Sequence, residues 1–341
     1  MNYPALQKPL LLGLILSILF LTSWEYYCRE HGFVPAPEDD KHLWAEHRGR
    51  VEDNNPNQVL ILGASRAHFD FQLDVWEEVT GNRPIMLAGP GKAPGPVLRD
   101  IVENTKFNGT IVLNVTEGLF FVPSADSSGG WSRSNEWVKF YHSRTYAQRF
   151  NHFLSGFIQP HLALLTAEQE GGPDLKALVQ GIPLSGRLKQ NFPPFPQFSY
   201  VDADRNTTMF DRIVTDTSFA NTIRRVWIFG DTTVNKYESI KPQIFKFYAD
   251  LFDAFKTRGG KIILTRNPSH GLVKANEDII HPRAQYWDKL VKESGWPAYH
   301  FEDYPELNKF FTPEWSHLST PDACEYTRSI LAIMKRDNAL K

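Results

Sequence analysis

A serine that follows an apolar run is the first residue of this chain that could do chemistry. In the stretch QVLILGASRAHFD, residues 58–70, the apolar run stops at Gly63 and Ser65 comes two residues later. A serine between a strand and the next helix is a candidate nucleophile, because backbone N–H groups at a helix start favour developing negative charge. The same place suits an ordinary N-cap, for which serine is a preferred residue. This stretch alone leaves both interpretations open.

A serine nucleophile needs a base, because its free hydroxyl is too weakly acidic to attack at neutral pH. Among eleven histidines, His317 in TPEWSHLSTPDA follows Glu314 by three residues. This spacing allows the carboxylate to bind Nδ1–H and leaves Nε2 for Ser65, so we predict a Ser65–His317–Glu314 triad. In the alternative interpretation, Thr320 caps a final helix with Pro321 at its first position and the preceding segment is only a loop. Both can hold.

The elements that must position these groups are predicted from hydropathy. Short apolar runs predict strands at 58–63, 84–88, 109–115, 260–265 and 298–302. Helical patterns lie near 70–80, 94–105, 242–258, 282–294 and 321–336. Near-continuous apolar strands separated by helices are typical of a parallel sheet covered on both faces. We therefore predict a doubly wound α/β sandwich, in which ligands gather beyond the carboxyl ends of the strands.

Residues 118–240 interrupt this alternation. They contain aromatic and proline-rich pieces and one predicted helix around 143–165. Connections in α/β folds are normally a few residues long, so an insertion of this size usually carries binding or partner contacts. Trp131, Trp137 and Tyr141 could stack on sugar faces or could pack the insertion onto the core. A structural subdomain without special chemistry is the simpler alternative.

An uncharged apolar segment lies near the amino terminus. The fifteen residues from Leu10 to Trp24 carry no charge, and Pro9 and the aromatics through Tyr27 extend them. Roughly 20 residues cross a bilayer, and aromatic residues are enriched at its surfaces. The segment is followed by bulky aromatics where a signal-peptidase site needs small residues, so we predict an uncleaved anchor rather than a cleaved signal peptide.

The chain is therefore predicted to have four parts. We expect a short cytoplasmic tail over 1–9, a transmembrane anchor over 10–27, a polar stalk over 28–57 and the folded domain over 58–341. The proline-punctuated composition of the stalk suits a segment that holds a domain off the bilayer. We infer that the domain lies outside the cytoplasm.

Composition excludes several classes of function. The chain has 341 residues, of which 42% are hydrophobic and 22% charged, and its net charge of -2 gives no electrostatic case for nucleic acid. Two cysteines make no disulfide framework. No H-x-x-x-H, C-x-x-C or EF-hand spacing occurs, and GASRAH lacks the later glycines and lysine of phosphate-binding loops. We expect no metal and no cofactor.

The two motifs together resemble the SGNH/GDSL hydrolase superfamily. The matching pieces are Gly63-Ala64-Ser65-Arg66 and the segment Glu314-Trp315-Ser316-His317-Leu318-Ser319. The resemblance covers the α/β parts, roughly 58–117 and 240–336. It implies a flavodoxin-like three-layer sandwich with a parallel sheet. The apolar segment and the large insertion look most like the branch of membrane-anchored polysaccharide O-acetyltransferases and acetylesterases.

The resemblance also implies further site residues. The family's usual aspartate is Glu314 here, and its side chain is one methylene longer. The oxyanion glycine should follow the second strand, where LAGPGKAPG offers Gly91 as first choice and Gly89 as second. The N–H groups of Ser65 and Gly91 would stabilise the oxyanion.

An asparagine should follow the third strand, and VLNVTEG offers Asn114 as a third oxyanion donor. If Asn114 instead lies inside the strand, Thr116 or Glu117 would face the site. Arg66 and Arg266 are candidate substrate contacts, because both follow strands at the expected sheet edge. Pairing with a surface carboxylate is the alternative for Arg66.

The function implied is a membrane-anchored extracytoplasmic serine esterase or O-acyltransferase. Its substrate would be an acetylated cell-envelope or exported polysaccharide, and the bacterial inner membrane facing the periplasm is the expected place. A membrane-bound O-acyltransferase partner would deliver the acyl group. The alternative is a catalytically inactive member of the superfamily that binds glycan or acts as a scaffold in an envelope complex.

Overall fold

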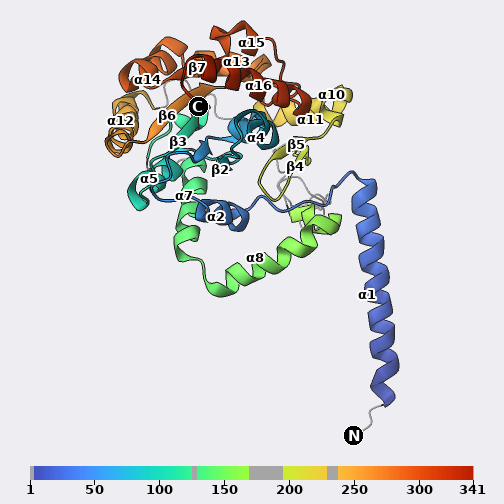
Figure 1. The fold of residues 1–341 in the computed structure, drawn as a ribbon. Helices are drawn as coiled ribbons and strands as arrows, with labels where there is room; N and C mark the ends of the chain where they lie inside the picture. Colours follow the sequence, from blue (N-terminus) through green and yellow to red (C-terminus); the bar gives the residue numbers. More distant parts are fainter. Residues whose placement is uncertain (1–3, 125–128, 169–194, 229–236, 341) are drawn as a thin grey trace.

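Figure 1 shows a computed structural model of the chain, which describes residues 4–124, 129–168, 195–228 and 237–340. All five predicted strands are present, as β1 (Val59–Leu62), β2 (Ile85–Met86), β3 (Thr110–Asn114), β6 (Lys261–Arg266) and β7 (Ala298–His300). They form one parallel sheet in the order β2-β1-β3-β6-β7. The protein is therefore an α/β protein whose parallel strands all end at the same edge.

Helices cover both faces of this sheet. Alternate strand residues point to opposite faces, so Leu60, Ile111 and Ile262 lie in one apolar cluster while Ile61 and Val112 lie in another. The first cluster is covered by α5 (Gly95–Asn104), α12 (Lys241–Thr257) and α14 (Trp287–Ser294). The second is covered by α3 (Ser65–Asp70), α4 (Leu73–Thr80), α15 (Pro305–Asn308) and α16 (Thr320–Arg336). The prediction of a parallel sheet covered by helices on both faces is confirmed.

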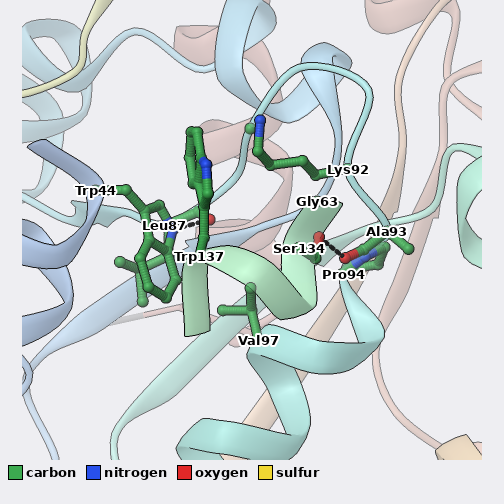
Figure 2. A pocket seen from close by; sticks show the side chains of 10 residues that line it. Trp44, Gly63, Leu87, Lys92, Ala93, Pro94, Val97, Ser134 and Trp137 are labelled. Carbon is green, nitrogen blue, oxygen red and sulfur yellow. Dashed lines mark hydrogen bonds between the residues drawn. The ribbon is translucent and has the colours of Figure 1, made fainter. Parts of the chain in front are cut away.

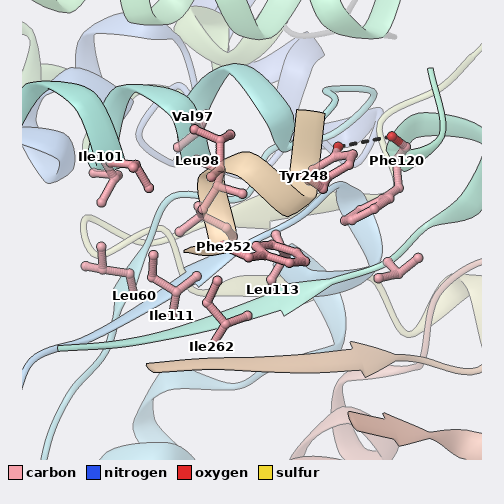
Figure 3. Packing of buried hydrophobic residues seen from close by; sticks show 14 of the residues in the cluster. Leu60, Val97, Leu98, Ile101, Ile111, Leu113, Phe120, Tyr248, Phe252 and Ile262 are labelled. Atoms are coloured by element: carbon pink, nitrogen blue, oxygen red, sulfur yellow. Dashed lines mark hydrogen bonds between the residues drawn. The ribbon is translucent and has the colours of Figure 1, made fainter. Parts of the chain in front are cut away.

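The first cluster shows how the sequence pattern becomes packing (Figure 3). Helix α12 carries apolar residues at helical spacing, and Tyr248 and Phe252 lie buried over strand residues Leu113 and Ile262. The Tyr248 hydroxyl donates a hydrogen bond of 3.0 Å to the Phe120 carbonyl, so its one polar group is satisfied. Each such side chain contributes about 1.5–3 kcal/mol through burial.

The chain between β3 and α12 contains the insertion. Its elements are α6 (Glu117–Phe120), α7 (Gly129–Ser143), α8 (Tyr146–Ile158), η1 (Gln159–His161), η2 (Ala163–Glu168), β4 (Ser199–Val201), β5 (Thr207–Met209), α10 (Arg212–Thr215), α11 (Thr217–Ile228) and η3 (Glu238–Ile240). The antiparallel pair β4-β5 forms a second, small sheet. Part of the proline-rich piece of the insertion lies outside the described residues. After β6 come α13 (Gly271–Ile280), η4 (Arg283–Gln285) and η5 (Phe301–Asp303).

The helix predicted around 143–165 is present as α8, which is shorter, and the helix α7 before it was not predicted. Helix α7 ends at Ser143, and a new helix, α8, begins at Tyr146. The break falls at Thr145, whose hydroxyl accepts from the Gln148 N–H in a reciprocal capping box. An N-cap of this kind satisfies the free N–H groups of a helix start and so favours a new helix over continuation of the old one.

The amino-terminal helix α1 (Pro4–Glu30) projects from the domain (Figure 1). Its stretch Leu6–Glu30 is long and apolar enough to cross a membrane, and none of its 18-residue apolar window is buried in the isolated chain. By length and composition, such a helix could be a membrane anchor or a signal sequence. Its last turns contact the insertion, because the Glu25 carboxylate accepts from the N–H groups of Ala163 at 3.0 Å and Leu164 at 2.8 Å.

The prediction of a polar stalk over 28–57 is corrected in its middle. Residues Lys41–Gly49 form helix α2, capped by the Asp40 carboxylate. Trp44 on this helix is fully buried, and its indole N–H donates to the Leu87 carbonyl at 3.0 Å. Because a buried tryptophan adds both apolar area and a satisfied donor, α2 belongs to the folded domain.

Candidate active site

Ser65 is the first residue of α3, directly beyond the carboxyl end of β1. The turn requires Gly63, which has φ +156°, because a Cβ there would lie 2.8 Å from the Cβ atoms of Ala67 and Asn114. The N-cap residue is Ala64, and no side chain caps this helix. The interpretation of Ser65 as a simple N-cap is therefore wrong, and its half-buried side chain lies at the edge where ligands bind.

Glu314 and His317 form a buried pair in the loop before α16. The carboxylate Oε1 lies 3.0 Å from His317 Nδ1 and also accepts from the His317 and Ser316 backbone N–H groups. Both side chains are at most 1% exposed. Because a proton on Nδ1 is fixed by the carboxylate, the neutral ring carries its lone pair on Nε2, as a general base requires.

The Glu314–His317 loop is held in an uncommon backbone conformation. Trp315 has φ +80°, a value that non-glycine residues rarely adopt. Its ring lies against Gly271, where a Cβ would come within 2.6 Å of the indole. The Trp315 carbonyl accepts from the His270 N–H at 2.9 Å. Strain of this kind persists only where the surroundings fix it, and it is concentrated at functional sites.

Helix α11 of the insertion completes the surroundings of this loop. The Trp227 indole N–H donates to the second carboxylate oxygen of Glu314. Arg224, one helical turn earlier, donates to the Pro313 carbonyl at 3.1 Å. Every oxygen of the Glu314 carboxylate is thus hydrogen-bonded, which removes the penalty of burying an ionised group without partners. The insertion therefore fixes the orientation of the carboxylate.

Aromatic rings surround the imidazole of His317. The Phe69 ring stacks on it with centroids 4.3 Å apart, and Trp227 and Phe198 lie with ring centroids at 5.8 Å and 6.1 Å. Phe69 follows Ser65 by four residues on α3, so both side chains lie on the same helix face. The face of α3 that carries Ser65 is therefore the face that meets His317.

Two hydrogen bonds join α3 to the histidine loop. Arg66 Nε donates to the Ser316 carbonyl at 3.2 Å, and the Leu318 N–H donates to the Asp70 carboxylate at 3.0 Å. The Nε2 atom of His317 is buried and has no hydrogen-bond partner within the described part of the chain. The structure thus brings the two predicted motifs side by side but does not form the Ser65–His317 hydrogen bond, which stays a prediction.

The predicted oxyanion donors lie at the same sheet edge. Gly91 has φ +64°, and its carbonyl accepts from Arg133 at 2.9 Å and 2.6 Å, which fixes the loop after β2. The Gly89 N–H donates to the Gly63 carbonyl at 3.4 Å and is thus occupied. Gly91 remains the better of the two candidate glycines.

Asn114 is the last residue of β3 and is fully buried. Its amide nitrogen donates to the carbonyl and hydroxyl of Thr265 on the neighbouring strand at 3.3 Å and 3.2 Å, and its oxygen accepts from the Thr116 hydroxyl. These bonds join β3 to β6, so an oxyanion would have to compete with them. The role of Asn114 as an oxyanion donor stays a prediction.

Arg66 and Arg266 lie in a buried ion cluster with Glu117 and Glu277. Each arginine is 1% exposed, and their Nη2 atoms lie 2.6 Å and 2.7 Å from the Glu277 carboxylate. Arg266 Nε also donates a hydrogen bond to the Glu117 carboxylate. Burial alone would raise the pKa of Glu277, but the two guanidinium groups outweigh it and lower the pKa to about 2. Substrate contact by either arginine stays a prediction and would require this cluster to open.

Two further titratable groups lie on α3 beside the histidine loop. Burial raises the pKa of Asp70 to about 7, although His317 and the Leu318 N–H act in the opposite direction. Burial lowers the pKa of His68 to about 3, despite the Asp39 carboxylate 3.5 Å from its Nε2. A strongly shifted pKa in a buried cluster is common at functional sites.

A narrow pocket lies beside the ends of β1 and β2 (Figure 2). Lys92 lies over the Trp137 ring at 3.6 Å, and the Ser134 hydroxyl donates to the Ala93 carbonyl at 2.6 Å. The pocket is lined by Trp44, Gly63, Leu87, Gly89, Lys92, Ala93, Pro94, Val97, Ser134 and Trp137. Neither Ser65 nor His317 lines it, so this pocket neighbours the candidate site without forming it.

The aromatic residues proposed for sugar stacking differ in exposure. Trp131 is 1% exposed and lies directly against Gly95, where a Cβ would be 2.4 Å from its ring, so it packs the insertion onto the core. Tyr141 is half-buried with the Arg48 guanidinium over its ring at 4.8 Å. Packing is therefore the role that the structure gives to Trp131.

Sequence reasoning missed the residues that complete the site from a distance. Trp227, Arg224 and Phe198 belong to the insertion, and no spacing relates them to His317. Asp70 was missed although it stands five residues after Ser65, because a single aspartate at a short helix carries no signal.

No protein-family model matches this chain, and no curated protein matches it in sequence. Among the residues that the structure describes, no group of three or more His, Cys, Asp and Glu side chains could hold a metal ion. Any function proposed for this chain therefore rests on the geometry of the site.

Proposed function

We propose that this chain is a membrane-anchored serine esterase or O-acyltransferase of the SGNH/GDSL type, with Ser65 as nucleophile, His317 as base and Glu314 as its partner. The observation that carries the proposal is the buried Glu314–His317 pair, which leaves Nε2 without a partner while Phe69, one turn from Ser65, stacks on the ring. An imidazole prepared in this tautomer beside a serine is the arrangement that acyl transfer needs.

The fold supports the same proposal. The strand order β2-β1-β3-β6-β7 corresponds to the flavodoxin-like order 2-1-3-4-5 once the insertion strands are left out. In such sheets ligands bind beyond the carboxyl ends of the strands near β1 and β3. Ser65 and Asn114 both stand there, directly after β1 and at the end of β3.

The proposed reaction follows from these groups. The Ser65 hydroxyl attacks the ester carbonyl while His317 Nε2 takes its proton, and Glu314 stabilises the imidazolium. The tetrahedral oxyanion binds the N–H groups of Ser65 and Gly91, each worth about 3 kcal/mol. Collapse expels the alcohol, which takes the proton from His317 and leaves an acyl-serine. Water or a sugar hydroxyl then attacks the acyl-serine by the reverse sequence, which gives hydrolysis or transfer.

The proposed substrate is an acetylated cell-envelope or exported polysaccharide. With α1 as an anchor in the bacterial inner membrane, the domain would face the periplasm, and a membrane-bound O-acyltransferase would supply acyl groups. Acetate release from an acetylated glycan, measured with and without an acceptor sugar, separates esterase from transferase. If the protein is a transferase, the acceptor sugar should lower acetate release and should itself become acetylated by the donor.

Covalent labelling by a fluorophosphonate tests the nucleophile. We expect the full chain in detergent to be labelled, Ser65→Ala to lose the label completely, and His317→Ala to react about 10⁴-fold more slowly. Ser316→Ala is the matched control, because Ser316 contacts Arg66 through its backbone carbonyl alone. Equal labelling of Ser65→Ala and the unchanged chain would rule out Ser65 as the nucleophile.

The second candidate is a catalytically inactive protein that binds glycan or acts as a scaffold. It is favoured by one observation: the Asn114 amide and the Gly89 N–H are already hydrogen-bonded within the sheet edge. This candidate predicts no fluorophosphonate labelling of the intact chain together with retained binding of an acetylated glycan.

A further inference from the structure

We propose that helix α8 lies in the surface of the same membrane that α1 enters, with its aromatic face among the lipid headgroups and upper acyl chains. The proposal rests on the anchoring part of the proposed function and is independent of the triad. It assigns to the insertion a second membrane contact beside the anchor.

Helix α8 exposes its apolar face and turns its polar face toward the domain, which is unfavourable in water. Phe150, Phe153 and Phe157 recur at helical spacing and are 62%, 60% and 62% exposed. Tyr146 and Leu154 extend the same face. Helices of water-soluble domains turn such a stripe toward the core, yet α8 contains no buried residue.

The polar side of α8 faces the domain. His152 Nε2 lies 3.2 Å from the Glu46 carboxylate of α2, and its ring stacks on His42 with centroids 5.8 Å apart. Ser155, one turn further on, is also partly buried. Polar contacts therefore hold α8 on the domain, and its apolar face is directed outward. A contiguous exposed apolar face marks an interaction surface.

The connection to α1 indicates that lipid covers this face. Helix α8 continues through η1 into η2, and the first N–H groups of η2 bind the Glu25 carboxylate of α1. Arg29 pairs with Glu25 at 2.6 Å and donates to the His161 carbonyl at 3.0 Å. The end of α8 is thereby fixed beside the last turns of α1. Figure 1 shows α8 along the lower edge of the domain, on the side to which α1 projects.

The residues around this junction have the composition of a membrane surface. Trp24 and Tyr27 stack at 5.1 Å near the end of α1, where aromatic residues mark the boundary between acyl chains and headgroups. Helix α8 contains no acidic residue, and the exposed Arg149 lies one turn before Phe153 on the same helix. Aromatic and aliphatic residues on one face with arginine beside them are typical of helices that lie in the interface plane.

Spin-label accessibility tests the location of α8. The full chain with Cys28→Ala and Cys324→Ala is reconstituted into vesicles of phosphatidylethanolamine and phosphatidylglycerol. Single labels replace Phe150, Phe153 or Phe157 on the aromatic face, and Asn151 is the control position on the same helix. Collisions with oxygen report lipid, and collisions with a water-soluble nickel chelate report water.

We expect high oxygen and low nickel accessibility at positions 150, 153 and 157, and nickel accessibility at least several-fold higher at 151. High nickel accessibility on all positions of α8 would overturn the proposal. Low accessibility to both reagents would also overturn it, because it would show that a second copy or another protein segment covers the face. A label at Leu14 of α1 shows whether the anchor itself is in lipid, and fluorophosphonate labelling reports the site separately.

A set of substitutions gives an independent test. Phe150→Ser, Phe153→Ser and Phe157→Ser together should raise nickel accessibility at a label on position 154 several-fold. The matched control replaces exposed apolar residues elsewhere, Val214, Leu272 and Ile279, by serine. The control should leave that label unchanged. An equal response of both sets, or of neither, contradicts the proposal.

Discussion

Helices α12 and α8 have the same kind of amphipathic pattern and opposite surroundings. On α12, Phe245, Phe252 and Phe255 are at most 6% exposed and pack against the sheet. On α8, Phe150 and Phe153 are about ten times more exposed and point away from the domain. A stripe of aromatic residues at helical spacing thus predicts that a helix has an apolar partner, and it leaves open whether that partner is protein or lipid.

The same contrast separates the two main parts of the chain. The α/β part buries its apolar faces and supplies Ser65, Glu314 and His317. The insertion contributes contacts on two sides, since α11 supplies Trp227 to the Glu314 carboxylate and α8 presents an exposed face next to α1. The insertion therefore both completes the candidate site and links it to the amino-terminal helix.

The largest expected effect comes from matched phenylalanine substitutions on the two helices. Phe252→Ala should lower the free energy of unfolding by about 3–5 kcal/mol, because it leaves a cavity in the core. Phe153→Ala should change it by less than about 0.5 kcal/mol, since its side chain contacts no core. Denaturant titration of both variants in the same detergent measures this. Similar losses for the two variants would remove the distinction between the helices.

The contribution of the insertion to the site is tested by Trp227→Phe. This change keeps the ring beside His317 and removes the N–H donor to Glu314. A hydrogen bond to a charged group is worth about 1.5–3 kcal/mol, so fluorophosphonate labelling should slow about 10- to 100-fold.

Trp44→Phe is the matched control for this variant, because it removes a buried indole donor that binds the Leu87 carbonyl away from the proposed triad. It should lower stability without slowing the labelling of folded protein. An unchanged labelling rate in Trp227→Phe would show that Trp227 only packs against the histidine loop and that its N–H bond to Glu314 does not affect reactivity.

The last expected effect is a change in the slope of stability against pH. The pKa of Asp70 is raised to about 7 by burial, so the folded state binds a proton that the unfolded state has lost. Between the ordinary pKa of aspartate and about pH 7, this group makes stability fall as pH rises.

Asp70→Asn should abolish that contribution, which is at most about 1.4 kcal/mol per pH unit. The measurement is the difference in unfolding free energy between variant and unchanged chain from pH 5 to 8. The difference cancels groups of opposite sign, such as His68, whose pKa burial lowers to about 3. Parallel curves for the two proteins would contradict the assignment.

Much of the core could be predicted from the sequence, because strands buried on both faces must be apolar throughout. The five runs at 58–63, 84–88, 109–115, 260–265 and 298–302 all contain strands of the sheet. Helix α7 was missed because its few apolar residues stand among glycine and polar residues. Helix α2 was missed because its apolar residues stand among charged ones.

The sequence by itself determined which groups could react and how the nearest of them pair. Glu314 and His317 are three residues apart, so their contact is a local property of one turn. Only the tertiary structure decided that α3 meets that turn through Phe69, that Trp227 binds Glu314 across the insertion, and that Arg66 and Arg266 share Glu277. These contacts join residues far apart along the chain, and their formation depends on the packing of whole elements rather than on any spacing that a sequence displays.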